Sequence, residues 1–563
     1  MRTRSWAAMA RASLAVAAAA ILLSIPSLAS AASPAVTLTI TGGGWGHGIG
    51  MSQWGARGYA NQGRDYRWIL AHYYQSTAVA SKPTVKVRVN LDANAAARAQ
   101  WRIQSGAETT LTVEQASDQS RAIALPWAGG TSYWVVTTGT NTAVHADESY
   151  YATSTVDGVT TKVLKHRPVA TPLMSFAGEC YAESNGFVKM VGTSGPFGHS
   201  GVVWRGTIHF KPTTAAASAS KAVNYVDLEK YLYGVVPRES PSAWPAEALK
   251  AQAVAARSYA YGDAEAGRTL YCTTASQVYN GYVGPKGGEM AATNAAVDAT
   301  KGQVVCFGPA QTVVKTYFCS ATGGRTANIE DVWLASSGVP YYTSVPDADT
   351  DSPDYKWTMD SLGTDAVSAS LRTALGATLS AASPAYVDGM RLDRAESGHT
   401  RYATIYWSDG SVYKVPGDRI RTALDLKSTK FTVMTRVESG HGAAKRTASW
   451  KRRTAAKSWG GAHYTSKKKG ARYTLRFKGT SVKWIGSKHA NSGRADVLLD
   501  GKKVATVDGY AQSAAYRQVM WASSGLKSGD HTLVIKVRGT KQAASTGTYV
   551  RVDAFELKGT PVR

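Results

Sequence analysis

The fold is decided by two segments. The first is Tyr231-Leu-Tyr-Gly-Val-Val-Pro237-Arg-Glu239-Ser-Pro241, and the second is Trp244-Pro245-Ala-Glu-Ala-Leu-Lys-Ala-Gln-Ala-Val-Ala-Ala-Arg-Ser-Tyr-Ala260. The second segment predicts a helix, because proline suits a first helical position, where no N–H donor is needed. Apolar residues then recur at the spacing of one helical face: Leu249, Ala253, Ala256 and Ala260. The first segment reads as a loop framed by prolines, and Glu239 is its only carboxylate. A rigid loop that holds one acid beside a helix predicts a positioned functional group.

These two segments, with Leu228-Glu-Lys directly before them, resemble the stage II sporulation protein D (SpoIID/LytB) family. The resemblance continues in family order over residues 226–357, through Ser276-Gln-Val-Tyr279 and Tyr317-Phe-Cys-Ser-Ala-Thr-Gly-Gly324. Members of this family are lytic transglycosylases of bacterial peptidoglycan, or relatives named for enhancing cell-wall amidases. The resemblance therefore implies a mixed α+β catalytic domain that acts on peptidoglycan.

A second signature of the same family is the glycine-rich stretch Gly42-Gly-Gly-Trp45-Gly-His47-Gly-Ile-Gly-Met-Ser-Gln53, in a segment that runs to Gln75. Glycines allow a close backbone approach to a ligand, and Trp45, His47 and Gln53 are the side chains such a loop presents. The alternative is a plain turn with Trp45 in the core. In the family pattern this segment follows the domain, whereas here it precedes it. Because domain termini often lie close together, we expect it to fold back within reach of Glu239.

Lytic transglycosylases of the kind that the resemblance implies use one acid, whereas most glycosidases need two. Glu239 is the expected acid: it would protonate the glycosidic oxygen and then take a proton from the muramyl C6 hydroxyl. It must start protonated, so apolar surroundings should raise its pKa, although a nearby helix N-terminus would lower it. Glu229 and Glu247 are the rival acids.

Side chains around this acid are candidates for binding sugar hydroxyls and N-acetyl groups. The predicted substrate-binding residues are Trp45, His47, Gln53, Arg257, Tyr259, Gln277, Tyr279 and Ser320. Taken singly, Gln277, Tyr279 and Ser320 are of a type that is more often structural. No C-x-x-C or His-x-x-x-His spacing is present, so we expect no metal and no cofactor.

The four cysteines of the chain predict disulfides, provided that the protein is exported. The segments 302–307 and 312–319 predict a hairpin whose register places Cys306 near Val313, which argues against a bond between Cys306 and Cys319. Three connectivities are open, and we expect Cys272–Cys319 with Cys180–Cys306. The family usually has a serine near position 319.

Residues 1–31 have the pattern of a secretory signal peptide: arginines at its start, an apolar run over 14–25, and Ala29-Ser-Ala31 as a cleavage site. The apolar run is shorter than the ~20 residues that a membrane span needs. We therefore expect a secreted, extracellular or wall-associated protein without a membrane span. Export also argues against nucleic acid as a partner.

Positive charge is concentrated at the C-terminal end of the chain. The formal net charge is +25, and residues 441–563 hold 25 Lys and Arg against 6 Asp and Glu. Outside the cell, such a segment attracts anionic cell-wall polymers. Strand-like alternation and an Asp500-Gly501 hairpin signal predict an all-β sandwich of jelly-roll type near this end.

The expected domain order is a signal peptide (1–31), a SpoIID-like catalytic domain (36–433) with a β-rich lobe (83–215), a basic linker (434–460) and a β-sandwich (461–560). The sandwich resembles carbohydrate-binding modules, and its candidates for sugar stacking are Trp484, Tyr510, Tyr516 and Trp521. Trp484 could equally be a core residue.

The favoured function is that of a secreted lytic transglycosylase, which cleaves peptidoglycan glycan strands between MurNAc and GlcNAc and leaves 1,6-anhydro-muramyl ends. The alternative is a non-catalytic peptidoglycan-binding protein that enhances a separate cell-wall amidase or hydrolase. The sequence leaves open whether stem peptides must first be removed from the strands.

Overall fold

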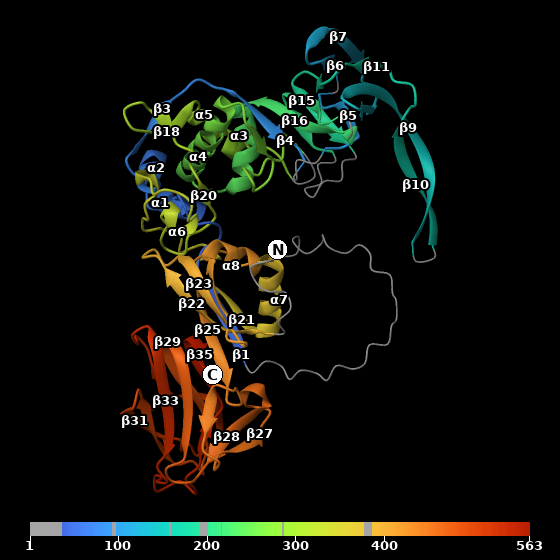
Figure 1. Ribbon diagram of the computed structural model, residues 1–563. Helices are drawn as coiled ribbons and strands as arrows, with labels where there is room; N and C mark the ends of the chain where they lie inside the picture. Colours follow the sequence, from blue (N-terminus) through green and yellow to red (C-terminus); the bar gives the residue numbers. More distant parts are fainter. Residues whose placement is uncertain are drawn as a thin grey trace.

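The computed structural model describes residues 36–92, 97–107, 109–156, 159–191, 201–214, 217–283, 287–375 and 385–563, so the expected signal peptide lies outside the described residues. The structure is mostly β, divided among several sheets, which confirms the expectation of a mixed, β-rich fold. Figure 1 shows a helical region with a β lobe beside it, a central region below, and a C-terminal β module at the far end. No helix of the described residues combines the length and apolar content that crossing a bilayer requires.

The helical region, residues 43–82 and 228–356, is built around one long helix, α4. Its helices are α1 (Gln53–Asn61), α2 (Tyr66–Tyr73), α3 (Leu228–Glu239), α4 (Ala246–Glu265), α5 (Ala291–Ala299) and α6 (Ile329–Val332), with a 3-10 turn at Pro340–Tyr342. Its short strands are β2 (Met51–Ser52), β3 (Thr77–Ser81), β18 (Gln303–Phe307), β19 (Thr312–Val313) and β20 (Phe318–Cys319). Every residue from 251 to 258 is buried, so α4 is covered on all sides rather than on one face. Its alanines allow α1, α2, α3 and α5 to pack closely around it.

The segment expected as a proline-framed loop is a helix, which corrects that prediction. Asp227 caps α3, with its side chain accepting hydrogen bonds from the backbone N–H groups of Glu229 and Lys230. Pro237 lies in the last turn, and the helix ends at Glu239. A proline this close to a C-terminus removes only one hydrogen bond of the helix, so it does not prevent helix formation upstream. Glu239 is therefore the last residue of a helix.

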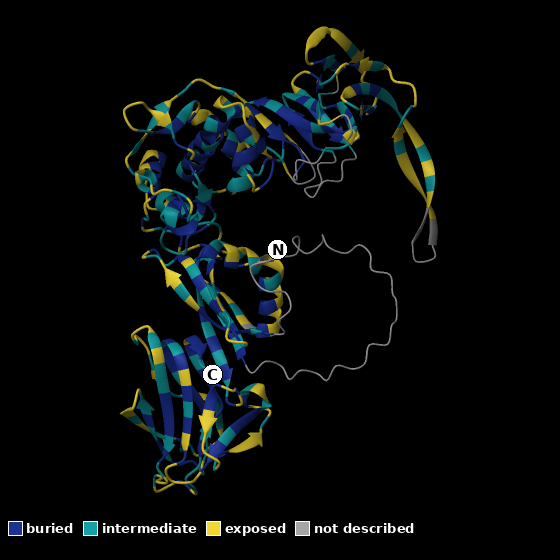
Figure 2. Cartoon of the chain, in the orientation of Figure 1, coloured by how far each residue is buried: buried dark blue, intermediate teal, exposed yellow. Residues whose placement is uncertain are grey.

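The β lobe consists mainly of two sheets, antiparallel except for the parallel pair β17 and β4, and holds the stretch expected to be β-rich, residues 83–215. One sheet has the order β17 (Thr269–Tyr271), β4 (Lys86–Asn90), β16 (Ser220–Asp227), β15 (Thr207–Pro212), β12 (Cys180–Glu183), β6 (Leu111–Gln115) and β7 (Asp118–Leu125). The other has the order β10 (Val159–Pro168), β9 (Asn141–Val156), β8 (Tyr133–Thr138), β5 (Gln100–Ser105), β13 (Phe187–Val191) and β14 (Val203–Arg205), with β11 (Met174–Phe176) on β9. The β9–β10 ribbon projects from the lobe, and Figure 2 shows little buried surface along it, in contrast to the lobe's interior.

The central region joins the N-terminal strand to segments from the second half of the chain. β1 (Val36–Gly42) lies between β21 (Trp357–Gly363) and β25 (Phe431–Glu438), with Thr37 opposite Arg436. The region also contains a three-stranded sheet and two helices: β22 (Val387–Arg394), β23 (Thr400–Trp407), β24 (Val412–Pro416), α7 (Thr364–Leu375) and α8 (Gly417–Ala423). As Figure 1 shows, β1 places the start of the glycine-rich segment at the junction of the central and helical regions.

The C-terminal β module, residues 439–563, is joined to the central region by one continuous sheet. That sheet has the order β21-β1-β25-β35-β29-β33-β30-β31. The strands of the module are β26 (Ala444–Arg446), β27 (Lys451–Thr454), β28 (Ala462–Ser466), β29 (Arg472–Lys488), β30 (Arg494–Leu499), β31 (Lys502–Asp508), β32 (Ala515–Ser523), β33 (Gly529–Val537), β34 (Val550–Val552) and β35 (Ala554–Pro561), with a 3-10 turn at Trp459–Gly461. Asp500 and Gly501 both have positive φ and connect β30 to β31, as the hairpin signal predicts.

The expected basic linker, residues 434–460, contains ordered structure instead. It includes the end of β25 and the strands β26 and β27, and Trp450 is 4% exposed within the core of the C-terminal β module. Its lysines and arginines do not prevent this, because the basic residues of β26 and β27 are all exposed to solvent. The central region and the C-terminal β module are therefore coupled by backbone hydrogen bonds.

The expected disulfides are absent, which corrects that prediction. Cys180, Cys272, Cys306 and Cys319 are buried thiols. Cys180, Cys306 and Cys319 lie on strands of three different sheets. Burial raises the pKa of Cys180, Cys272 and Cys319 to about 12, so these thiols remain protonated at neutral pH.

Candidate active site

A cavity of about 590 Å³ lies where the glycine-rich segment meets the helical region. Six of the residues predicted for the site line it: Trp45, His47, Gln53, Glu239, Tyr259 and Ser320. Among the described residues that line the cavity, Glu239 is the only carboxylic acid. The structure thus brings together two segments that are far apart in sequence.

Glu239 faces this cavity and is held by two hydrogen bonds. Its Oε2 accepts from Nε2 of Gln53 at 3.0 Å, and its Oε1 accepts from the backbone N–H of Val278 at 3.1 Å. Burial raises the pKa of Glu239 above its ordinary value, and the two hydrogen bonds oppose the rise. The carboxyl group also lies at the C-terminal end of α3, where the helix dipole disfavours a negative charge. The acid form of Glu239 is therefore favoured relative to an exposed glutamic acid.

Gln53 is positioned by the way the glycine-rich segment packs. β2 pairs with β20 in parallel, and Ser52 then caps α1, so that Gln53 is the first residue of this helix. A Cβ on Gly46 would lie 2.6 Å from Cys319 Cβ, and a Cβ on Gly48 would lie 2.4 Å from the His399 ring. These glycines therefore allow close approach to the protein's own chain, rather than to a ligand.

His47 and Trp45 form part of the cavity wall. Nδ1 of His47 accepts a hydrogen bond from the backbone N–H of Ile49 at 3.0 Å, and the ring packs against Trp333. Burial, followed by the positive charge of Arg421, lowers the pKa of His47 to about 4, so this ring is neutral at neutral pH. Trp45 is 47% exposed, which leaves its ring available for stacking against a sugar.

The turn that carries Ser320 is held by two aspartates, the buried Asp349 and the half-buried Asp347. The oxygens of Asp349 accept hydrogen bonds from the backbone N–H groups of residues 322, 323 and 324 at 2.7–2.8 Å. Asp347 accepts from the Tyr73 hydroxyl at 2.5 Å, which ties the turn to α2. Burial and the nearby charge of Asp349 raise the pKa of Asp347 to about 6.

Three predicted substrate-binding residues do not reach the cavity. Arg257 is 1% exposed and binds Glu229 with two hydrogen bonds, at 2.9 and 2.6 Å. Gln277 is fully buried between Tyr231 and the backbone of α4, and the Tyr279 hydroxyl donates to Asn224 at 3.0 Å. These side chains stabilise the interior, which corrects their expected role.

Several groups at the cavity are not among the residues predicted for the site. Tyr317 and Trp333 also line the cavity, and Arg421 reaches it from α8 of the central region. The backbone N–H of Val278 has no side-chain signature at all. Trp333 packs on both His47 and Tyr317, so the aromatic wall is continuous.

The candidates for sugar stacking in the C-terminal β module differ in how far they are buried. Trp484 is 1% exposed and belongs to the core, so it is a core residue rather than a sugar-stacking one. Trp521 lies directly opposite it on β32 and packs partly against the same core. Tyr510 and Tyr516 are half-buried, and Tyr516 contacts the ring of His489. Across the described residues, no group of three or more His, Cys, Asp or Glu side chains is arranged to hold a metal ion.

Residues 216–307 match the sequence model of SpoIID, stage II sporulation protein. The amidase enhancer of Bacillus subtilis (strain 168) is 41% identical over 128 residues, which cover 23% of this chain and 16% of that protein. Stage II sporulation protein D of the same strain is 31% identical over 157 residues, which cover 25% of this chain and 45% of that protein. Among solved structures, a family two carbohydrate esterase from Cellvibrio japonicus matches with a TM-score of 0.18 and 14% sequence identity. The matched part covers 23% of this chain and 34% of the esterase chain, and so weak a likeness has no bearing on function.

This chain thus spans less than half the length of either curated relative. The match over residues 216–307 includes Glu239, its helix α3, and the whole of α4. Through this segment the chain is similar to the SpoIID family.

Proposed function

We propose that the protein is a secreted, wall-associated lytic transglycosylase that cleaves the glycan strands of peptidoglycan between MurNAc and GlcNAc. One observation carries the proposal: a single carboxylic acid with a raised pKa faces a polar cavity whose described lining contains no second acid. Hydrolases that use two carboxylates need a second one within about 10 Å to activate water or to act as nucleophile. A one-acid site suits a reaction whose nucleophile belongs to the substrate.

In the proposed reaction, Glu239 donates its proton to the glycosidic oxygen, and the bond from that oxygen to muramyl C1 breaks. The resulting carboxylate then takes the proton of the C6 hydroxyl, whose oxygen bonds to C1 and closes a 1,6-anhydro ring. Glu239 ends protonated, as it began, and no water is consumed. Gln53 and the N–H of Val278 stabilise the carboxylate between these steps. The neutral His47 and the protonated Cys319 thiol serve as wall and hydrogen-bonding groups.

The test is product analysis on purified glycan strands, prepared with and without stem peptides, in water whose oxygen carries a heavy isotope label. We expect muramyl ends that are one water lighter than hydrolysis products and that contain no heavy oxygen. Incorporation of heavy oxygen at C1 would identify a hydrolase and contradict the proposed reaction.

The pH dependence of cleavage gives a second test, because the reaction starts from the acid form of Glu239. The raised pKa keeps this form populated to higher pH, so the rate should fall only as pH rises through that raised pKa. Gln53→Ala removes a donor that favours the carboxylate, so the pKa should rise further and the falling limb should move to higher pH.

The measurement is the initial rate of cleavage of soluble strands as a function of pH, for wild type and Gln53→Ala. Gln62→Ala, an exposed change at the far end of α1, is the control and should leave the profile unchanged. A limb that stays in place or moves to lower pH in Gln53→Ala would argue against this role of Gln53.

A second candidate function is enhancement of a separate cell-wall amidase, which is favoured by the name of the relative that is 41% identical over 128 residues. In that case the cavity binds glycan without cleaving it. Strand binding without any cleavage product, together with faster amidase action on whole walls, is the result expected for this alternative.

A further inference from the structure

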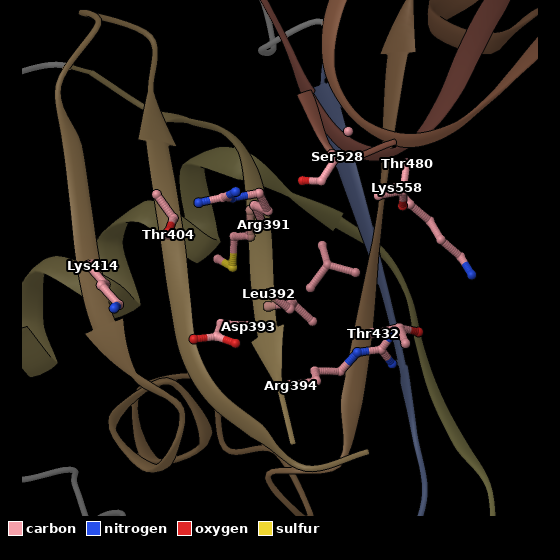
Figure 3. A pocket seen from close by; sticks show the side chains of 14 residues that line it. Arg391, Leu392, Asp393, Arg394, Thr404, Lys414, Thr432, Thr480, Ser528 and Lys558 are labelled. Carbon is pink, nitrogen blue, oxygen red and sulfur yellow. The ribbon is translucent and has the colours of Figure 1, made fainter. Parts of the chain in front are cut away.

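A second cavity, of about 410 Å³, lies far from Glu239 in the fold, where the β22–β24 sheet meets the C-terminal β module. Figure 3 shows Arg391, Thr404 and Lys414 on the three strands of the sheet, facing Thr480 and Ser528 of the module. None of the residues that line this cavity belongs to the candidate active site.

The lining of this cavity is strongly basic. Arg391 lies directly opposite Thr404, and Thr404 directly opposite Lys414, so these three form one cross-strand row on the solvent face of the sheet. Arg394 lines the cavity from further along β22, whereas the Lys558 side chain extends away from Arg391 in Figure 3.

Within the described part of the chain, no carboxylate lies within ion-pair distance of Arg391, Arg394 or Lys414, and Asp393 is the only acid in the lining. By contrast, many other basic side chains of the protein are paired, such as Arg563 with Asp388 and Lys503 with Asp496. The ammonium of Lys414 lies 4.1 Å from the centroid of the Tyr402 ring, a contact that does not neutralise its charge. Cations that lack a carboxylate partner and surround a concave surface attract anions more strongly than the same charges on a convex one.

A smaller, separate cavity of about 230 Å³ lies along the same junction. Neighbouring residues of the same strands line the two: Gly479 lies beside Lys478 on β29, and Gly559 beside Thr560 on β35. Gly389 packs on Thr560 between the two cavities, so closely that a Cβ added to Gly389 would lie 2.8 Å from the threonine Cβ. The larger cavity, with basic side chains of β22 and β24 in its lining, has room for several anionic groups rather than for a single small ion.

We propose that this junction is a binding site for a linear anionic polymer, in which Arg391, Arg394 and Lys414 hold successive phosphate or carboxylate groups. Guanidinium groups bind both kinds of anion through paired N–H donors. The hydroxyls of Thr404, Thr480 and Ser528 are placed to bind the polyol or sugar between the charges. This site does not depend on glycan cleavage. Unlike the positive charge spread over residues 441–563, it is one cavity with a defined set of lining residues.

The test measures fluorescence anisotropy of the full-length protein with labelled poly(glycerol phosphate), oligogalacturonate and neutral dextran. The variant Arg391→Gln/Arg394→Gln/Lys414→Gln should lose about tenfold or more in affinity for at least one of the two polyanions. Asp393→Asn should gain affinity, because it removes the only acid of the lining. All four residues are exposed, so neither variant should unfold. Tighter binding of poly(glycerol phosphate) would identify the phosphodiester as the group that the site recognises, and tighter binding of oligogalacturonate would identify the carboxylate.

The matched control is Lys467→Gln/Lys468→Gln/Lys469→Gln, which removes the same charge from an exposed turn of the module. This turn precedes Arg472 of β29, which lies opposite Lys536 of β33 in the sheet. The cavity lies at the other end of the same two strands, where Gly479 is opposite Gly529. The control should lose less than about threefold in affinity, an amount typical of exposed charges. Equal losses in both triple variants, or dextran binding as tight as polyanion binding, would overturn the proposal.

Discussion

Glu239→Gln should lower the rate of glycan cleavage by about 10²–10⁴-fold, the usual contribution of a positioned general acid. Gln has the shape of the acid but has no proton to give to a glycosidic oxygen. The fold should persist, because the amide oxygen can accept from Val278 while Gln53 reverses its own amide to accept from the new donor. Because the pKa of Glu239 is higher in the folded than in the unfolded state, this group costs stability at every pH above its unfolded-state pKa, so the variant should be at least as stable at neutral pH.

The matched control for this change is Glu247→Gln in α4. Glu247 is a rival acid by sequence, but its carboxylate binds Lys250 at 2.7 Å and the backbone N–H of Tyr66 at 2.9 Å, outside the cavity lining. It should cleave strands at a rate close to that of wild type. Release of anhydro-muramyl products by Glu239→Gln at the wild-type rate would show that Glu239 is not the acid.

Arg257→Ala should destabilise the helical region by about 3–5 kcal/mol, because it leaves the carboxylate of Glu229 buried without its partner. Arg257 also donates to the carbonyl oxygens of Val297 and Gln303, at 3.1 and 3.2 Å, and so ties α3 and α4 to the segment from α5 to β18. Loss of this network should reduce the hydrogen-exchange protection of α4 as well as the melting temperature.

The control is Arg268→Ala, which breaks the pair with Asp263 at 2.7 Å at a site where the arginine is 64% exposed. Exposed pairs of this kind contribute at most about 1 kcal/mol. If Arg257→Ala left the protection of α4 unchanged and raised KM for glycan strands instead, Arg257 would be a substrate-binding residue after all.

Local features of the fold were predictable from sequence where short-range chemistry determines them. The hairpin register that places Cys306 opposite Val313 is confirmed, and so is the Asp500-Gly501 turn. The loop expected before Glu239 was wrong, because prolines near the end of a helix give the same signal as prolines in a loop. The start of α4, by contrast, was predicted to within one residue, at Ala246.

The candidate site was predictable in part, since the family motifs point to Glu239, Gln53 and His47, and all three line one cavity. Arg257 and Gln277 were misassigned because a buried polar residue that satisfies an internal partner cannot be told from a ligand-binding one by residue type. Arg421 could not be found, since α8 reaches the cavity only through the packing of the central region. The disulfide expectation failed for a similar reason: pairing depends on the distance between strands, which composition does not determine.

The position of β1 has a consequence for how the chain can fold. Its neighbours begin at Trp357 and end at Glu438, so the first described strand has no partner until most of the chain has been made. At ordinary rates of synthesis, the delay between Thr37 and Arg436 is about 20–80 s. Because pairing across so long a stretch must overcome loop-closure entropy, it should be among the late and slow steps of folding. Until the central region has formed, Arg421 of α8 has no fixed place in the cavity beside Glu239, so the candidate active site is completed only when the central and helical regions have both assembled.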